Sequence, residues 1–281
     1  MTEVLNKIRS VKRSLPGQET ADGAGVRLTR LIGGPQLPQL DPFLLLDDFR
    51  SDDPDDYIGG FPPHPHRGFE TVTYLLAGQV EHRDNAGHTG VLQAGGVQWM
   101  TAGRGVVHSE MPQQQDGLLA GFQLWVNLPA KHKMTEPRYQ EFDRHAIARE
   151  QRGDDVDIRV VAGETSRHTR GPVTQLMTPT LFLDITLAAG ARFSEPLAED
   201  YNAFVYLVEG GVSIRGTLLE KRTLAVLGDG EAVEMNASEP SRLILVAGQP
   251  LREPIARRGP FVMNNEAELR QAFTDYQEGR F

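Results

Sequence analysis

The chain has 281 residues, with 38 acidic and 29 basic side chains and a formal net charge of −9. Such a charge repels phosphate backbones, so direct binding to nucleic acid is not expected. Because the chain has no cysteine, disulfides, thiolate metal sites and cysteine nucleophiles are excluded, and any metal site must use histidine, carboxylate and water.

Residues 1–17 contain Arg9, Lys12 and Arg13 among scattered apolar residues, and they lack the continuous apolar run of a secretion signal. No later stretch approaches the roughly 18 consecutive apolar residues that a membrane-spanning helix requires. We therefore expect a cytoplasmic protein that does not insert into a membrane.

Short apolar segments with an alternating pattern make up most of the chain and predict an all-β protein. The turns at residues 84–87 (Asp-Asn-Ala-Gly) and 228–230 (Gly-Asp-Gly) supply residues that tolerate positive φ, as tight turns between antiparallel strands require. The clearest predicted strands are residues 71–76, 121–127, 180–187, 204–208 and 241–246.

Two pairs of candidate metal ligands lie in predicted strands of the first half. His64 and His66 are two residues apart, and so are His108 and Glu110. Residues two apart in a strand project to the same face, so each pair can direct two ligands toward one point inside a β-barrel. Three imidazoles and one carboxylate suit a divalent transition metal and leave positions open for water, dioxygen or substrate.

The two halves of the chain share a sequence pattern. Residues 74–78 (Tyr-Leu-Leu-Ala-Gly) recur as residues 206–210 (Tyr-Leu-Val-Glu-Gly), and each copy is followed at similar spacing by a glycine, Gly95 or Gly228. A repeated unit of this size predicts two similar barrels in tandem.

We place an N-terminal metal-binding barrel in residues 1–130 and a C-terminal barrel in residues 171–281. Residues 131–170 are polar and charged with few apolar runs, which predicts a linker region. No histidine follows His168, so the C-terminal barrel is expected to bind no metal.

One amphipathic helix is predicted at the end of the C-terminal unit. Residues 265–268 (Asn-Glu-Ala-Glu) resemble a capping box, which marks a helix start. Apolar residues then follow at helical spacing, and we expect this stripe to pack against one of the barrels. These residues are Leu269, Ala272, Phe273 and Tyr276.

The motifs that carry the candidate ligands resemble the pirin family of the cupin superfamily. The resemblance is carried by residues 64–74 (His-Pro-His-Arg-Gly-Phe-Glu-Thr-Val-Thr-Tyr) and 98–112, which include Gln-Trp-Met-Thr-Ala-Gly-Arg-Gly and His-Ser-Glu-Met-Pro. Residues 41–49, 123–128 and 259–264 are also pirin-like, so the resemblance spans nearly the whole chain. It implies two tandem cupin (jelly-roll) barrels, with metal in the first.

The same resemblance implies one metal ion, typically Fe(II), held by His64, His66, His108 and Glu110, although Zn, Ni, Cu, Mn or Co would also fit these ligands. Glu70 is the ambiguous residue. In general cupins a glutamate after His-x-His is a ligand, and Glu70 shares strand parity with His64 and His66. In pirin-like proteins the ligand is at the Glu110 position, so Glu70 is expected to face the cavity and support the site by bonding Arg67, Arg104 or a ligand imidazole.

The remaining histidines are interpreted as solvated surface residues. His82 and His88 flank the turn at residues 84–87, whereas His132, His145 and His168 lie in or near the predicted linker.

Two functions from different classes follow from the resemblance. The first is a metal-dependent dioxygenase that cleaves the ring of a flavonol such as quercetin with O2, with Glu110 and, less strongly, Glu70 as candidates for the base that takes the substrate proton. The alternative is an iron-dependent co-regulator, whose metal redox state alters a surface that binds a regulatory protein partner.

Overall fold

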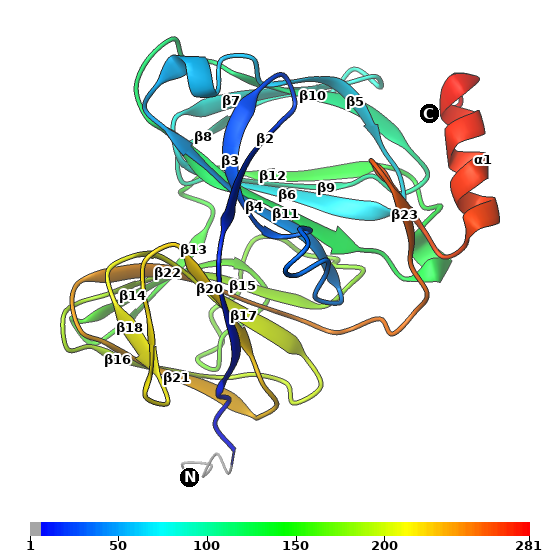
Figure 1. The fold of residues 1–281 in the computed structure, drawn as a ribbon. Helices are drawn as coiled ribbons and strands as arrows, with labels where there is room; N and C mark the ends of the chain where they lie inside the picture. The colour runs from blue at the N-terminus through cyan, green and yellow to red at the C-terminus, as the bar shows by residue number, and fades with distance from the viewer. Residues whose placement is uncertain (1–6) are drawn as a thin grey trace. The chain divides into compact units, whose positions relative to one another are not determined.

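The computed structural model describes residues 7–281, and most of them lie in β-strands (Figure 1). The chain divides into two compact units. The first barrel consists of Gln18–Arg144 and Leu251–Phe281, and the second barrel consists of residues 7–17 and His145–Pro250. The prediction of an all-β protein with two tandem barrels and one C-terminal helix is confirmed.

The first barrel is built from a seven-stranded and a four-stranded antiparallel sheet. Their strand orders are β12-β9-β6-β11-β4-β3-β2 and β5-β10-β7-β8. The strands are β2 (Gln18–Asp22), β3 (Val26–Ile32), β4 (Phe43–Ser51), β5 (Phe61–His66), β6 (Phe69–Ala77), β7 (Gln79–Asp84), β8 (Thr89–Gln93), β9 (Val97–Thr101), β10 (Val106–Pro112), β11 (Leu119–Asn127) and β12 (Arg138–Phe142), with short 3-10 turns at η1 (Pro54–Asp56) and η2 (Ala130–His132).

Apolar side chains from both sheets of the first barrel meet in one cluster. Leu28, Phe49 and Leu75 come from the larger sheet, and Val80 and Leu92 come from the smaller one. Each buried side chain of this size contributes about 1.5–3 kcal/mol relative to its exposed state. This cluster holds the two sheets face to face, and so fixes the position of β5 and β10, the strands that carry the candidate ligands.

The second barrel repeats this plan with strand orders β1-β20-β17-β22-β15-β14-β13 and β16-β21-β18-β19. Its interior is filled by a large apolar cluster that includes Phe193, Val233 and Met235 from β16 and β21. The strands are β1 (Val11–Pro16), β13 (Ala148–Arg152), β14 (Val156–Ala162), β15 (Thr180–Leu187), β16 (Arg192–Pro196), β17 (Asn202–Glu209), β18 (Val212–Ile214), β19 (Thr217–Leu219), β20 (Thr223–Leu227), β21 (Ala232–Ala237) and β22 (Ser241–Gly248).

The structure divides the chain differently from the predicted boundaries. Residues 131–170 are not a plain linker, because β12 extends the larger sheet of the first barrel and β13 and β14 belong to the second. Strands at the edge of a sheet keep one side in solvent, so their sequences are polar and resemble a linker. In Figure 1 the dark blue β1 runs along the second barrel, where it pairs with β20 at the edge of the larger sheet.

The C-terminal helix α1 (Glu266–Gln277) belongs to the first barrel, not to the C-terminal unit as predicted. It follows the hairpin of β23 (Ala256–Arg258) and β24 (Phe261–Met263), and its buried Leu269 and Ala272 pack against Phe261 and Met263. The predicted helix start is confirmed, because Asn265 Oδ1 accepts a hydrogen bond from the Glu268 amide at 3.0 Å.

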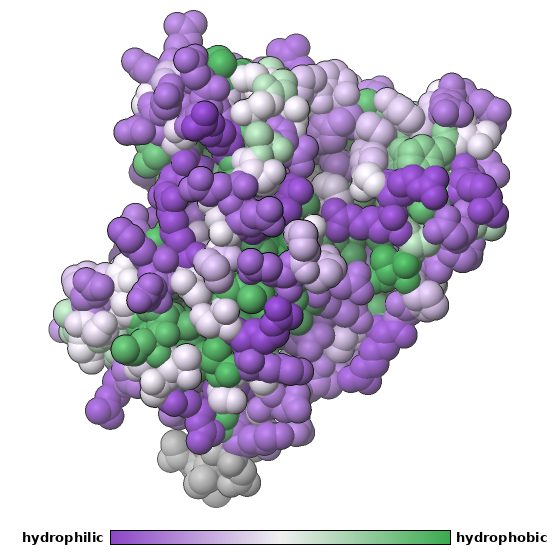
Figure 2. Space-filling view, viewed as in Figure 1, coloured by the Kyte–Doolittle hydropathy of each residue, from purple (hydrophilic) through white to green (hydrophobic). Residues whose placement is uncertain are grey.

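Polar and charged residues cover most of the face drawn in Figure 2, with apolar residues in smaller groups between them. Across residues 7–281, no helix has the length and apolar character needed to cross a lipid bilayer.

Candidate metal centre

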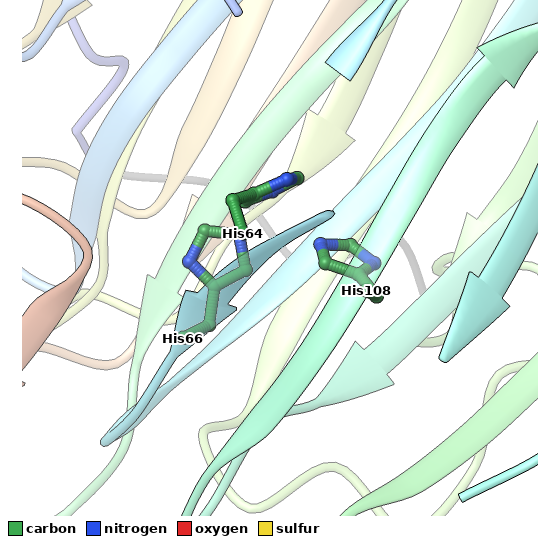
Figure 3. Close-up of side chains that lie close together, drawn as sticks. All are labelled: His64, His66 and His108. Carbon is green, nitrogen blue, oxygen red and sulfur yellow. The ribbon is translucent and has the colours of Figure 1, made fainter. Parts of the chain in front are cut away.

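Three histidines converge inside the first barrel. His64 and His66 alternate along β5, and the antiparallel register pairs His64 directly with His108 on β10. One ring nitrogen from each lies within 4.8 Å of the others, and Figure 3 shows the three rings gathered from these two neighbouring strands. The ring centres of His64 and His108 are 4.5 Å apart.

Burial keeps two of these imidazoles in the form that binds metals. His66 and His108 are 3% and 2% exposed, and loss of solvation, followed by the neighbouring histidines, lowers the pKa of both rings well below the ordinary value. Metal binding requires the neutral imidazole. Both rings therefore present free lone pairs at neutral pH.

The hydrogen bonds of the three rings also fit a metal site. Three buried ring nitrogens have no hydrogen-bond partner: Nδ1 and Nε2 of His108 and Nδ1 of His66. A buried polar atom left without a partner destabilises the folded state by about 1–3 kcal/mol. His64 Nδ1 lies 2.8 Å from the Pro62 carbonyl oxygen, which can only accept, so Nε2 is the ring nitrogen of His64 that is left for a metal. Three imidazole nitrogens close to one another are the donor set expected for a divalent transition metal.

Glu110 lies beside this cluster but outside the set of three. Its buried carboxylate accepts hydrogen bonds from Thr73 Oγ1 at 3.0 Å and from Gln123 Nε2 at 3.1 Å. The register of β10 against β5 shifts between His108 and Glu110, and this bulge places Glu110 opposite Phe61. Glu110 nevertheless lines the same cavity as His64 and His66.

His82 is a buried member of this region that the sequence analysis assigned wrongly to the surface. It is 3% exposed, stands opposite Glu110 in the register of β7 and β10, and places Nδ1 3.6 Å from Glu110 Oε1. Burial lowers the pKa of His82, and the Glu110 carboxylate opposes that effect. His82 alternates with Val80 and Asp84 along β7, and this alternation indicates that the three side chains share one face of the strand.

The other four histidines lie as follows. His88, His145 and His168 are exposed, as predicted, and His132 is half-buried.

Glu70 does not face the cavity, contrary to the prediction. It lies on β6 three residues from Thr73, and residues three apart in a strand point to opposite faces, so Glu70 points away from Glu110. Gly68, at φ +89°, breaks the strand after His66, so the parity of β5 does not continue into β6. Glu70 accepts a hydrogen bond from Thr101 Oγ1 at 2.6 Å, and burial raises its pKa.

The predicted partners of Glu70 are also engaged elsewhere. Arg67 pairs with Asp275 of α1 at 2.7 Å and donates from Nε to the Arg104 carbonyl. The Arg104 side chain pairs with Glu136 at 2.7 Å.

The histidines open into a cavity of about 540 Å³. Aromatic and aliphatic side chains form most of its wall, and charged side chains lie among them. The lining residues include Leu28, Leu45, Phe49, Phe61, Pro62, Pro63, Trp125, Arg30, Asp47, Gln123 and Arg257. A concave space whose surface is mostly apolar, with polar groups among the lining residues, is the usual form of a small-molecule site.

Two β-barrels and a histidine cluster in the first define a two-barrel cupin protein with a candidate metal site. Residues 25–126 match the Pirin family, and residues 182–281 match the Pirin C-terminal cupin domain. The chain belongs to the pirin family, as its motifs predicted.

The similarity to relatives extends over nearly the whole chain. A pirin-like protein of Caulobacter vibrioides is 48% identical over 274 residues, covering 98% of this chain and 99% of the relative. Human pirin is 43% identical over 283 residues, covering 98% and 95%. The crystal structure of a quercetin 2,3-dioxygenase from Acinetobacter baumannii superposes with a TM-score of 0.90 at 35% identity, covering 98% of each chain.

Proposed function

We propose that the first barrel binds one divalent transition-metal ion through His64, His66, His108 and Glu110. The observation that carries this proposal is the convergence of three imidazoles, two of them buried and neutral, with ring nitrogens that have no other partner. Glu110 lies on the same strand as His108, so rotation of its side chain would bring the carboxylate toward the histidines. We expect Fe(II), and the same donors fit Zn, Ni, Cu, Mn and Co.

We further propose that the site is that of a flavonol 2,3-dioxygenase, which cleaves the ring of a substrate such as quercetin with O2. A bound metal would supply Lewis acidity toward the substrate hydroxyl and redox chemistry toward O2. Within the cavity, Phe49 and Phe61 provide apolar aromatic surfaces for a flat substrate. We assign to Glu110 the role of the base that takes the proton of the flavonol hydroxyl. The hydrogen bonds from Thr73 and Gln123, which hold its carboxylate at the cavity, support this assignment.

The test is turnover of quercetin by protein loaded with iron and, separately, with nickel, copper, manganese or cobalt. We expect loss of the flavonol absorbance in air together with uptake of oxygen in the same time course. If neither flavonol loss nor oxygen uptake occurs with any of these metals, in protein shown to hold about one ion per chain, the dioxygenase proposal is contradicted. The proposal of a metal site would still stand. In that case the redox-sensing co-regulator would be the favoured function, tested by capture of a protein partner in only one oxidation state.

A further inference from the structure

We infer that the cavity of the first barrel receives a flat aromatic ligand that carries an anionic group remote from the metal, and that Arg257 binds that group. This inference rests on the proposed function and narrows its substrate class. Arg257 lies on β23 and lines the same cavity as His64 and His66.

The position of Arg257 is fixed by two contacts that leave part of its guanidinium open. The guanidinium carbon lies 4.9 Å from the centre of the Trp125 ring, and Nη1 donates to the Leu44 carbonyl oxygen at 2.9 Å. Stacking on an aromatic ring orients a guanidinium without using its hydrogens. The remaining N–H groups are therefore available to a ligand.

The charges of the cavity wall single out Arg257 as the cation that a ligand would meet. Arg30, the other arginine of this wall, donates to both oxygens of Asp47 at 2.9 and 2.8 Å and also pairs with Asp22. Within residues 7–281 no carboxylate lies in ion-pair distance of Arg257. Asp47 acts on Arg257 only at longer range, and Arg30 holds both of its oxygens. The adjacent Arg258 contacts Glu266 at 3.7 Å. A guanidinium without a carboxylate partner favours a carboxylate or phenolate ligand, which it can bind through two parallel hydrogen bonds.

Trp125 connects this cation to the histidine cluster. Its ring centre is 5.2 Å from that of His66, with the two rings edge to face, and the Arg257 guanidinium lies over the same ring. A rigid ligand that reaches the histidines at one end therefore passes Trp125 and meets Arg257 near its other end. Apolar side chains such as Phe49 and Phe61 line the same cavity, which favours aromatic rings over a flexible polar chain.

The experiment compares binding of 4′-carboxyflavonol with that of its methyl ester to metal-loaded protein, by fluorescence titration. The two compounds share their rings and differ in one negative charge at the end remote from the flavonol hydroxyl. We expect the acid to bind about tenfold more tightly than the ester. Arg257→Ala should abolish this preference, and Arg257→Lys, which keeps the charge but loses the planar fork, should retain part of it.

Arg258→Ala is the matched control, because Arg258 adjoins Arg257 but does not line the cavity, and it should keep the full preference. Equal binding of acid and ester by the unmodified protein, binding of neither, or an undiminished preference in Arg257→Ala would overturn the inference. If the protein turned over both flavonols but bound the acid no more tightly than the ester, the inference about Arg257 would be overturned and the dioxygenase proposal would be supported. Arg257-dependent binding of the acid without turnover of either compound would support the ligand class and count against the dioxygenase.

Discussion

At the scale of single residues, the centre depends on how each side chain meets its strand neighbours. His64, His66 and His108 converge because alternation along β5 and direct pairing with β10 place them on one face. Glu110 follows on the same strand, and its carboxylate is held by Thr73 and Gln123. Two neutral hydrogen-bond donors fix this carboxylate without pairing it to a cation, so it stays available as a ligand and a base.

Glu110→Gln should separate these two roles. The amide oxygen can still approach the metal, but it takes no proton, so we expect kcat for a flavonol to fall by about 10²–10⁴-fold while most of the metal is retained. Steady-state turnover and metal content of the same preparation measure both effects. Glu81→Gln is the control, because Glu81 lies on the adjacent β7 and contacts Arg83 on the protein surface. An unchanged kcat in Glu110→Gln would exclude Glu110 as the base.

The convergence of His64, His66 and His108 could be predicted from the sequence, because residues two apart in a regular strand share a face. The bulge that separates Glu110 from this cluster could not. Glu70 and His82 could not be placed in that way. The position of Glu70 depends on the break at Gly68, and the burial of His82 depends on which strand pairs with β7. Register between distant strands is a property of the folded barrel rather than of a local motif.

At the scale of elements, the break between β5 and β6 is fixed by buried polar contacts. Lys133, which follows η2, is 1% exposed and donates to Gly68 O at 2.8 Å, Asn127 Oδ1 at 2.7 Å and Val262 O at 3.0 Å. Burial lowers the pKa of Lys133 to about 8. One ammonium group thus links the β5–β6 break to β11 and β24. It thereby stabilises the residues that directly follow His66.

Lys133→Met should destabilise the first barrel by about 2–5 kcal/mol, because three buried acceptors lose their donor. Both tryptophans of the chain, Trp99 and Trp125, lie on strands of this barrel, so tryptophan fluorescence during urea denaturation reports on it. The exposed Lys131 supplies the control variant Lys131→Met, for which we expect little change. Equal midpoints for the two variants would show that the Lys133 bonds do not stabilise the barrel.

Element types were largely predictable, and their assignment to a barrel was not. The N-cap at Asn265 and the apolar stripe of α1 follow local rules. The cap bond is found, and Leu269, Ala272 and Phe273 of the stripe pack in the predicted way, whereas Tyr276 is exposed. The barrel that this helix covers depends on the β23–β24 hairpin and on the ion pair between Arg67 and Asp275, which are 208 positions apart. Likewise, β12 and β13 look like a linker because they are edge strands, which are polar on their exposed side.

At the scale of the whole molecule, one sheet plan occurs twice with different interiors. The second barrel fills the space between its sheets with apolar side chains such as Phe193 and Met235, whereas the first keeps a cavity that ends at the histidines. The repeat of residues 74–78 at 206–210 indicated the duplicated plan, and the distribution of histidines indicated which copy holds the candidate metal site. Residues 7–17 belong to the second barrel and residues 251–281 belong to the first. The sequence gives no comparable local signal for this arrangement, because the partner of an edge strand is not specified by its own sequence.

The metal content of the purified protein, measured by elemental mass spectrometry after loading with iron and removal of free metal, tests the central claim most directly. We expect about one ion per chain in the unmodified protein and in His88→Ala, whose histidine is exposed, and less than about a tenth of that in His66→Ala. Two ions per chain, or full occupancy in His66→Ala, would contradict a single centre built on His64, His66 and His108.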